Sequence, residues 1–103
     1  HVENDEMELV TIDSLKPGKG IGKLILDKVI NIAKKENVKR LWLITTNDNM
    51  NALKFYQKND FHLVNIYPNA LEESRKIKSE IPEIGEDGIP LRDEIELEII
   101  FRS

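Results

Sequence analysis

The chain has 103 residues, of which 40% are hydrophobic and 33% are charged, so it can form one small domain with a limited core. It contains no cysteine, which excludes disulfides and thiolate-bound metals and is typical of a reducing compartment, so we expect a cytoplasmic protein. The net charge of −4, without interleaved basic and aromatic residues, argues against nucleic-acid binding, and no apolar run is long enough for a membrane span or a signal peptide.

The charge is unevenly distributed along the chain. Residues 14–60 contain ten Lys/Arg and four Asp/Glu, a net charge of +6, while the remainder carries −10. A basic centre suits a polyanionic ligand, and Lys16, Lys19 and Lys23 could reach its phosphates. The two histidines, His1 and His62, lack neighbours at metal-ligand spacing, so we expect no metal.

Hydrophobic periodicity and turn residues predict alternating strands and helices. In chain order these are a strand over 7–12, a helix over 20–36, a strand over 40–46, a short helix ending near Asn59, a strand over 61–67, a charged helix over 70–78, a loop over 79–92 and a strand over 93–101. Asn37 is expected to cap the end of the first helix, and Asp48 or Asn49 the start of the second. Leu71 and Ile77 are expected to face inward from the charged helix.

Three alternating glycines lie where the first strand passes into the first helix, in the segment 16–23 (KPGKGIGK). Glycines let the backbone come close to a ligand, and the first N–H groups of a helix have no partner within the helix. This arrangement is typical of a phosphate site. A glycine-rich turn without a ligand is the plainer alternative.

Two well-known glycine loops fit this segment poorly. A Walker loop needs Gly-x-x-x-x-Gly-Lys followed by Ser or Thr, but Pro17 stands at the first glycine position and Leu24 at the hydroxyl position. The dinucleotide fingerprint Gly-x-Gly-x-x-Gly matches Gly18 and Gly20, but its third glycine falls on Lys23.

Two segments together resemble the GNAT (Gcn5-related) N-acetyltransferase family. The first is the coenzyme A pyrophosphate loop Gln/Arg-x-x-Gly-x-Gly/Ala, which falls on 17–22 with Gly20 and Gly22 in place and Pro17 at the Gln/Arg position. The second, 51–61 (NALKFYQKNDF), has the alanine, Phe-Tyr pair, lysine and final phenylalanine of the family's later signature. Asp60 replaces the usual glycine, so a strained backbone is expected there.

The resemblance implies an α/β (α+β) fold, a mixed sheet with helices on both faces, formed as one partial domain over 1–103. Its parts are the glycine loop and cofactor helix at 16–36, the second signature at 47–61, and the C-terminal loop and strand at 79–103. It implies acetyl transfer from acetyl-CoA to a primary amine, with the diphosphate on the backbone amides of 18–23. The cofactor-binding residues so implied are Ile12, Gly18, Lys19, Gly20, Ile21, Gly22, Lys23 and Asn51.

Tyr56 matches the family's tyrosine that protonates the leaving sulfur. Its hydroxyl can donate a proton to a thiolate and is itself protonated at neutral pH. Alternatively, Phe55 and Tyr56 are an aromatic pair that packs the short helix, and Asn51 is a helix cap rather than a ligand contact. Glu8 or Glu6 could act as general base through water, although surface carboxylates are the plainer reading of both.

Whole GNAT domains carry further strands and helices before the glycine-loop strand, whereas six residues precede Met7 here. The fold is therefore expected to be N-terminally truncated, with the strand at 7–12 at a sheet edge or paired outside this chain. This predicts a homodimer, with strand exchange as one form. A non-catalytic CoA-binding or dimerising module is the alternative to an enzyme.

Overall fold

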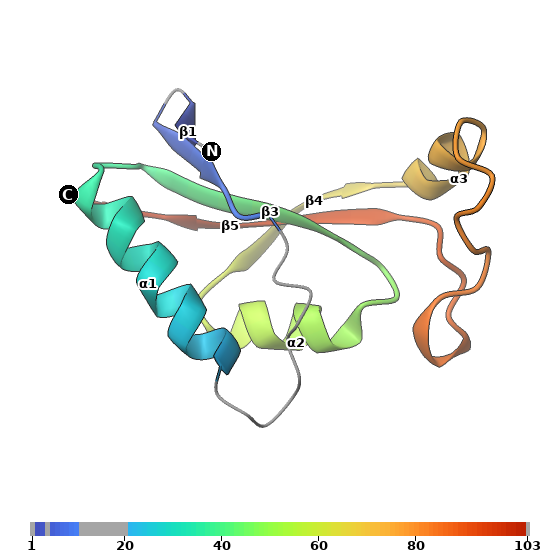
Figure 1. Ribbon diagram of the computed structural model, residues 1–103, viewed down its shortest axis with the longest axis horizontal. Helices are drawn as coiled ribbons and strands as arrows, with labels where there is room; N and C mark the ends of the chain where they lie inside the picture. The colour runs from blue at the N-terminus through green and yellow to red at the C-terminus, as the bar shows by residue number, and fades with distance from the viewer. Residues whose placement is uncertain (1, 4, 11–20, 103) are drawn as a thin grey trace. The chain divides into compact units, whose positions relative to one another are not determined.

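The structure is a computed structural model that describes residues 2, 3, 5–10 and 21–102, and side chains from residue 5 to 10 and from 22 onward. Its elements are drawn in Figure 1. They are β1 (Val2–Glu3), β2 (Glu6–Glu8), α1 (Ile21–Lys35), β3 (Arg40–Thr46), α2 (Met50–Lys58), β4 (His62–Tyr67), α3 (Ala70–Arg75), the 3₁₀ helix η1 (Glu86–Gly88) and β5 (Glu94–Ile100).

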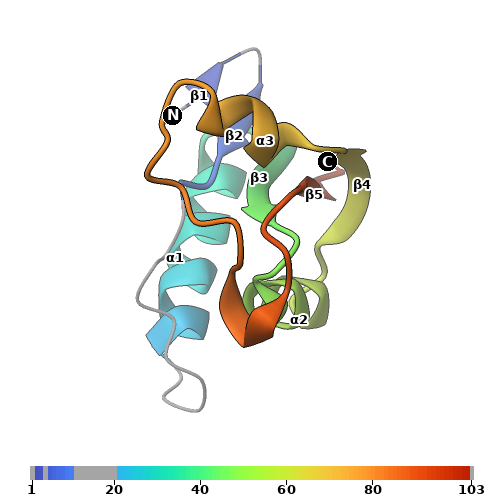
Figure 2. The ribbon, with the colours of Figure 1, turned by 90° about the vertical axis from the view of Figure 1, so that its right-hand side faces the viewer.

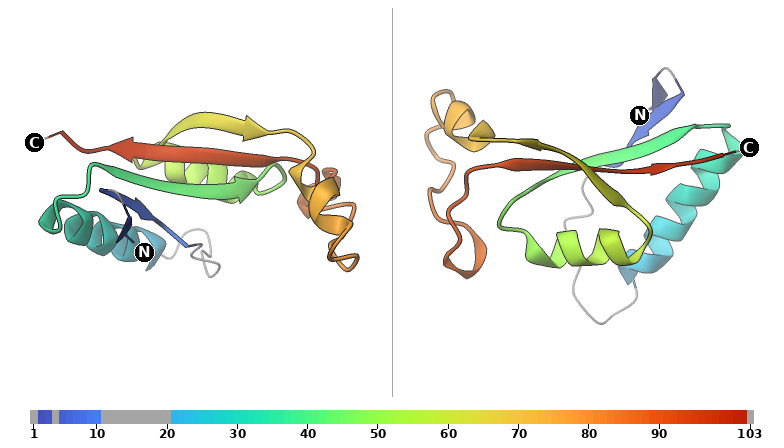
Figure 3. Two further views of the ribbon diagram at one scale, coloured as in Figure 1. Left: turned by 90° about the horizontal axis from the view of Figure 1, so that it is seen from above. Right: turned by 180° about the vertical axis from the view of Figure 1, so that it is seen from behind.

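The strands form one mixed sheet in the order β1-β2-β3-β5-β4. β1 is antiparallel to β2, and β2 is parallel to β3. β5 runs in the opposite direction to β3 and β4 (Figure 3). The predicted α/β class with a mixed sheet is therefore confirmed, while the placement of helices on both faces stays a prediction.

The chain divides into two compact units. The first comprises His1–Leu43 and Glu98–Ser103, and the second comprises Ile44–Leu97. Strands β3 and β5 run through both units. The prediction of a single partial domain over 1–103 is not tested by this division and stays a prediction.

In the first unit, β2 lies between two strands of its own chain. Glu6, Met7 and Glu8 are in register with Arg40, Leu41 and Trp42 of β3, and Met7 also faces Val2 of β1. The prediction that the 7–12 strand is a sheet edge or pairs outside the chain is wrong at Met7, because Val2 of the short strand β1 pairs with it there. Residues 11 and 12 of the predicted strand lie outside the described residues.

Helix α1 buries its apolar face in the first unit. Leu26 and Ala33, seven residues apart and so on one face of the helix, are fully buried, as is Leu41 of β3. Asn37 follows the helix with a φ of 58°, the left-handed conformation that ends a helix, so its predicted role is confirmed. The predicted bounds of this helix differ from the observed ones by one residue at each end.

In the second unit, α2 connects β3 to β4. Its inward residues Ala52, Leu53 and Tyr56 are buried, and Asn59 caps its end. Asp60 follows with a φ of 74°, so the strained turn predicted at this position is confirmed. The turn reverses the chain into β4, all six residues of which are exposed.

Helix α3 is shorter than predicted, because it ends at Arg75. Leu71 is buried as expected, but Ile77 is 87% exposed, so its predicted inward position is wrong. The reason is local: residue 77 lies beyond the end of α3, and a spacing of six residues does not place two side chains on one helical face.

The segment 79–92 returns from α3 to β5 (Figure 2) and is structured internally. Ile84 and Pro90 form an isolated antiparallel bridge, and the backbone N–H of Gly85 donates to the carbonyl of Ile89 at 2.8 Å. The N–H of Leu91 donates to the carbonyl of Glu83 at 2.9 Å. The predicted loop is therefore a closed turn around η1. Within the described residues, no helix is both long and apolar enough to cross a membrane.

Candidate active site

The predicted glycine loop lies mostly outside the described residues. Four of the predicted cofactor-binding residues are therefore not described, namely Ile12, Gly18, Lys19 and Gly20. What is described is the start of α1 at Ile21, which has no acidic side chain in its first turn. The positive end of the helix dipole is thus not neutralised by its own first turn, as an anion site requires.

Gly22 and Lys23 lie in that first turn of α1. Gly22 is half-buried, and Lys23 is exposed. The Nζ of Lys23 donates to Oδ1 of Asp27 at 3.2 Å, one helical turn further on. Exposed pairs of this kind contribute little energy, so the ammonium group remains available to a phosphate.

The predicted general-base candidates differ in their surroundings. Glu6 accepts a hydrogen bond at 3.0 Å from Nη1 of Arg40, whose Nε donates to Glu98 at 2.6 Å. The guanidinium of Arg40 also lies 5.5 Å from the ring centroid of Trp42. This bridge across three strands favours a structural role for Glu6. Glu8 is half-buried on the next outward position of β2.

In the second unit, Asn51 lies in the first turn of α2 and is exposed. The helix cap is Asn49, whose Oδ1 accepts from the backbone N–H of Ala52 at 3.1 Å. Of the two predicted caps, Asn49 is confirmed and Asp48 is wrong. The alternative that Asn51 is a cap is also wrong, so its exposed side chain is left available for a ligand.

Tyr56 is 2% exposed and lies between two other aromatic rings. The centroid distances are 5.3 Å to Phe55 and 5.2 Å to Phe61, with interplanar angles of 75° and 68°. Edge-to-face contacts of this kind hold a ring in place. The aromatic packing is thus confirmed, and it fixes the ring without testing the acid role, which stays a prediction.

A run of polar residues at 46–49, from the last residue of β3 to the residue before α2, makes contacts that the sequence does not reveal. Asp48 is 6% exposed. Its Oδ1 accepts from the hydroxyl of Thr46 at 2.5 Å, and its Oδ2 accepts from the backbone N–H of Glu86 at 2.9 Å. The sequence signal for these contacts is a polar cluster directly after a buried strand. This signal does not identify Glu86 as the distant partner of Asp48.

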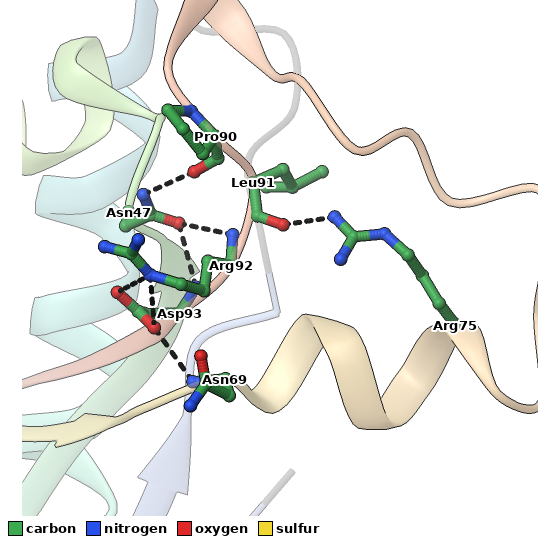
Figure 4. A network of polar contacts seen from close by, with 7 residues as sticks. All are labelled: Asn47, Asn69, Arg75, Pro90, Leu91, Arg92 and Asp93. Atoms are coloured by element: carbon green, nitrogen blue, oxygen red, sulfur yellow. Dashed lines mark hydrogen bonds and ion pairs between the residues drawn. The ribbon is translucent and has the colours of Figure 1, made fainter.

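Asn47 binds the segment that leads into β5 (Figure 4). Its Nδ2 donates to the carbonyl of Pro90 at 2.8 Å, and its Oδ1 accepts from the backbone N–H groups of Arg92 and Asp93 at 3.0 and 2.9 Å. The backbone N–H of Asn47 donates to the carbonyl of Asp93 at 3.0 Å. One side chain therefore holds this segment of backbone through three hydrogen bonds.

Asp93 extends the same network to the start of α3. Its Oδ1 accepts from the backbone N–H of Asn69 at 2.8 Å, and its carboxylate pairs with Arg92 at 3.2 Å. The hydrogen bond from Asn69 is the main cause that lowers the pKa of Asp93; burial acts against it and Arg92 adds to it. Asn69 itself has a φ of 61°, in the left-handed region that asparagine tolerates better than most residues.

Arg75, the last residue of α3, closes the network from the other side (Figure 4). Its Nη2 donates to the carbonyl of Pro82 at 2.7 Å and to that of Leu91, and its Nε donates to the carbonyl of Ile81 at 3.2 Å. A rigid guanidinium fork can satisfy several carbonyls at once. Both arms of the 79–92 segment are thus bound by side chains outside it.

Comparisons with known proteins show the family of this chain. The model of the acetyltransferase (GNAT) family matches residues 5–61, more than half of the chain. An uncharacterized protein of Bacillus subtilis strain 168, YdhI, is 45% identical over 94 residues, which are 91% of this chain and 59% of that protein. This chain therefore belongs to the GNAT acetyltransferase family, and it spans about three fifths of the length of this curated relative.

Two solved structures are similar as well. A Bacillus subtilis acetyltransferase in complex with CoA has a TM-score of 0.80 at 24% identity, over 98% of this chain and 64% of that one, and supports the fold alone. A GNAT family acetyltransferase from Elizabethkingia anophelis with acetyl-CoA bound has a TM-score of 0.70 at 31% identity, over 93% and 60% of the two chains.

Proposed function

We propose that this chain carries the acetyl-CoA-binding part of an N-acetyltransferase that transfers an acetyl group to a primary amine. The observation that supports it best is the family match over 5–61, which includes both the glycine loop and α2. The similar protein from Elizabethkingia anophelis has acetyl-CoA bound. The start of α1 without acidic residues and the exposed Asn51 are what such a ligand would need.

The proposed roles follow the two units. In the first, the backbone amides of 18–23 hold the diphosphate, Lys19 and Lys23 add positive charge, and Ile12 meets the acetyl and pantetheine end through its backbone. In the second, Asn51 contacts the pantetheine arm, and Tyr56 is the acid.

The proposed reaction transfers one acetyl group from the thioester sulfur of acetyl-CoA to the amine nitrogen. The neutral amine nitrogen attacks the thioester carbonyl carbon, and the C–S bond breaks as the C–N bond forms. The departing thiolate of CoA takes the phenolic proton of Tyr56, which is restored from solvent. The proton that the amine loses goes to water or to a carboxylate such as Glu8.

A second copy of the chain is the proposed protein partner, and the cytoplasm the proposed location. Among the described strands, β1 and β4 are the outer ones of the sheet. β4 exposes Leu63, Val64 and Ile66 and contains no Lys, Arg, Asp or Glu. Natural edge strands usually carry such charges to prevent pairing with other chains, so β4 is suited to pair with its own copy.

Calorimetry with acetyl-CoA, followed by a thiol-release assay over a panel of amines, tests the proposed function. Binding together with amine-dependent release of CoA is the expected result. Binding without release from any amine would point instead to a non-catalytic CoA-binding module. If acetyl-CoA does not bind at all, the proposal fails.

A further inference from the structure

The turn 46–49 joins three parts of the second unit through consecutive side chains. Thr46 donates to Asp48, Asn47 holds the backbone at 90–93, and Asn49 caps α2. Asp48 accepts from Glu86 in the closed turn around η1. The start of α2 is therefore tied to a segment that lies almost forty positions later in the sequence.

Asp48 and Gly85 fit each other closely. A Cβ added to Gly85 would lie 2.1 Å from Oδ2 of Asp48 and 2.6 Å from its Cγ. Such distances do not occur between real atoms, so the carboxylate occupies the space that a side chain at position 85 would need. The φ of Gly85 is −96°, which any residue can adopt, so the constraint is space and not backbone conformation.

We propose that Asp48 is a positioning residue for the acetyl-CoA site, which it serves by fixing the start of α2 against the 85–86 backbone. This inference rests on the proposed function. Asn51 and Tyr56, which carry the proposed cofactor and acid roles, lie three and eight residues after Asp48. The Asn49 cap, directly next to Asp48, fixes the first turn of the helix that bears them.

The carboxylate is required in this place because it accepts two hydrogen bonds with two oxygens. An Asn side chain keeps the shape but has one acceptor oxygen, so when that oxygen accepts from the N–H of Glu86, the Thr46 hydroxyl must reverse and accept from the NH₂ group. Both hydrogen bonds also lose the charge that strengthens them, so the turn is held less firmly. A displacement of about 1 Å at a reacting group can reduce a rate roughly a hundredfold.

The experiment uses the whole chain with Asp48→Asn, Gly85→Ala and the double variant. Acetyl-CoA affinity is measured by calorimetry, kcat and KM for acetyl-CoA by thiol release with the amine that reacts fastest in the panel, and folding by circular dichroism and Tm. We expect each single variant to weaken acetyl-CoA binding and to lower kcat, by roughly tenfold or more in kcat/KM. The double variant should lose little more kcat/KM than the more impaired of the two single variants, because both changes break the same contact.

Matched controls are Asp87→Asn and Glu83→Gln, two exposed acidic residues of the same segment, which should leave Kd, KM and kcat unchanged. Folded Asp48→Asn and Gly85→Ala proteins with a lower Tm but unchanged Kd, KM and kcat would show a purely structural role and overturn the inference. If both variants fail to fold, Thr46→Val, which removes only the hydroxyl donor, tests the positioning role of Asp48. Unchanged Kd, KM and kcat in Thr46→Val would then overturn the inference. An unmodified chain that binds no acetyl-CoA refutes the proposed function itself, which is a different result from unchanged constants in active variants.

Discussion

At the scale of single residues, Tyr56 is the position where packing and the proposed chemistry coincide. Its ring is held by Phe55 and Phe61, and these contacts do not need the hydroxyl. Tyr56→Phe should therefore keep the helix packed while it removes the proton donor. We expect kcat to fall by roughly a hundredfold or more, with the Kd for acetyl-CoA unchanged.

Single-turnover thiol release and calorimetry on the same preparation separate these two quantities. Phe55→Leu, which alters the packing and keeps the hydroxyl, is the matched control. A Tyr56→Phe protein with undiminished turnover would leave the ring with a packing role alone.

Asp93 makes the stability depend on pH in a definite direction. Because its pKa is lowered in the folded protein, the folded state favours the charged carboxylate. The corresponding stabilisation is complete at pH values well above the unfolded-state pKa of about 3.8 and is lost as the pH falls through the lower folded-state pKa. The free energy of unfolding, measured in urea, should therefore decline between pH 6 and pH 2.5. In Asp93→Asn this decline should be smaller.

Asp87→Asn is the control for this measurement, because Asp87 is exposed on the same segment and has a φ of 56°, which Asn also tolerates. If the free energy of unfolding declines equally at low pH in the two variants, Asp93 is not the group that causes the decline.

At the scale of elements, the start of α2 offers two neighbouring asparagines with different expected roles. Asn49 caps the helix, so Asn49→Ala should lower the free energy of unfolding by about 1 kcal/mol. Asn51 is exposed and makes no part of the cap, so Asn51→Ala should leave stability within about 0.5 kcal/mol and weaken acetyl-CoA binding. Denaturant unfolding and calorimetry on both variants check this pair, and each is the control for the other.

The sequence predicted the elements well where the information is local. The alternating pattern of β3, the apolar face of α1 and the Asn49 cap all depend on residues within a few positions of one another, and β3 was predicted with its observed bounds. Ile77 was placed wrongly because nothing in its charged surroundings marks the end of α3 at Arg75.

The candidate site was predictable only in part, for the same reason. Asn51 and Tyr56 are predicted as site residues because they lie in a recognisable motif, and their roles stay predictions. The roles of Asn47 and Asp48 depend on partners 38 to 46 positions away, and hydrophobic periodicity carries no information on such pairs. The edge position predicted for the 7–12 strand is wrong at Met7, because β1, which is too short to show a pattern, pairs with it there.

At the scale of the whole molecule, the proposed dimer can be tested at β4. The exposed fractions of Leu63, Val64 and Ile66 are 44%, 45% and 56%, and a lysine at the central position should oppose strand pairing between copies. We expect the unmodified chain to be a dimer at micromolar concentration in light scattering after size exclusion, and Val64→Lys to shift it to a monomer. Ile77→Lys, on an exposed residue outside the sheet, should leave the mass unchanged.

A monomer at high micromolar concentration in the unmodified chain would contradict the proposed dimer. A dimer that persists in Val64→Lys would place the contact elsewhere than β4.

The fit between Gly85 and Asp48 also limits how this sequence can change over time. While the carboxylate is in place, position 85 accepts no side chain, and a smaller residue at 48 would leave the N–H of Glu86 without its acceptor. Neither site can therefore drift alone. Substitutions at the two would have to arise together, or in an order that passes through a less stable ancestor.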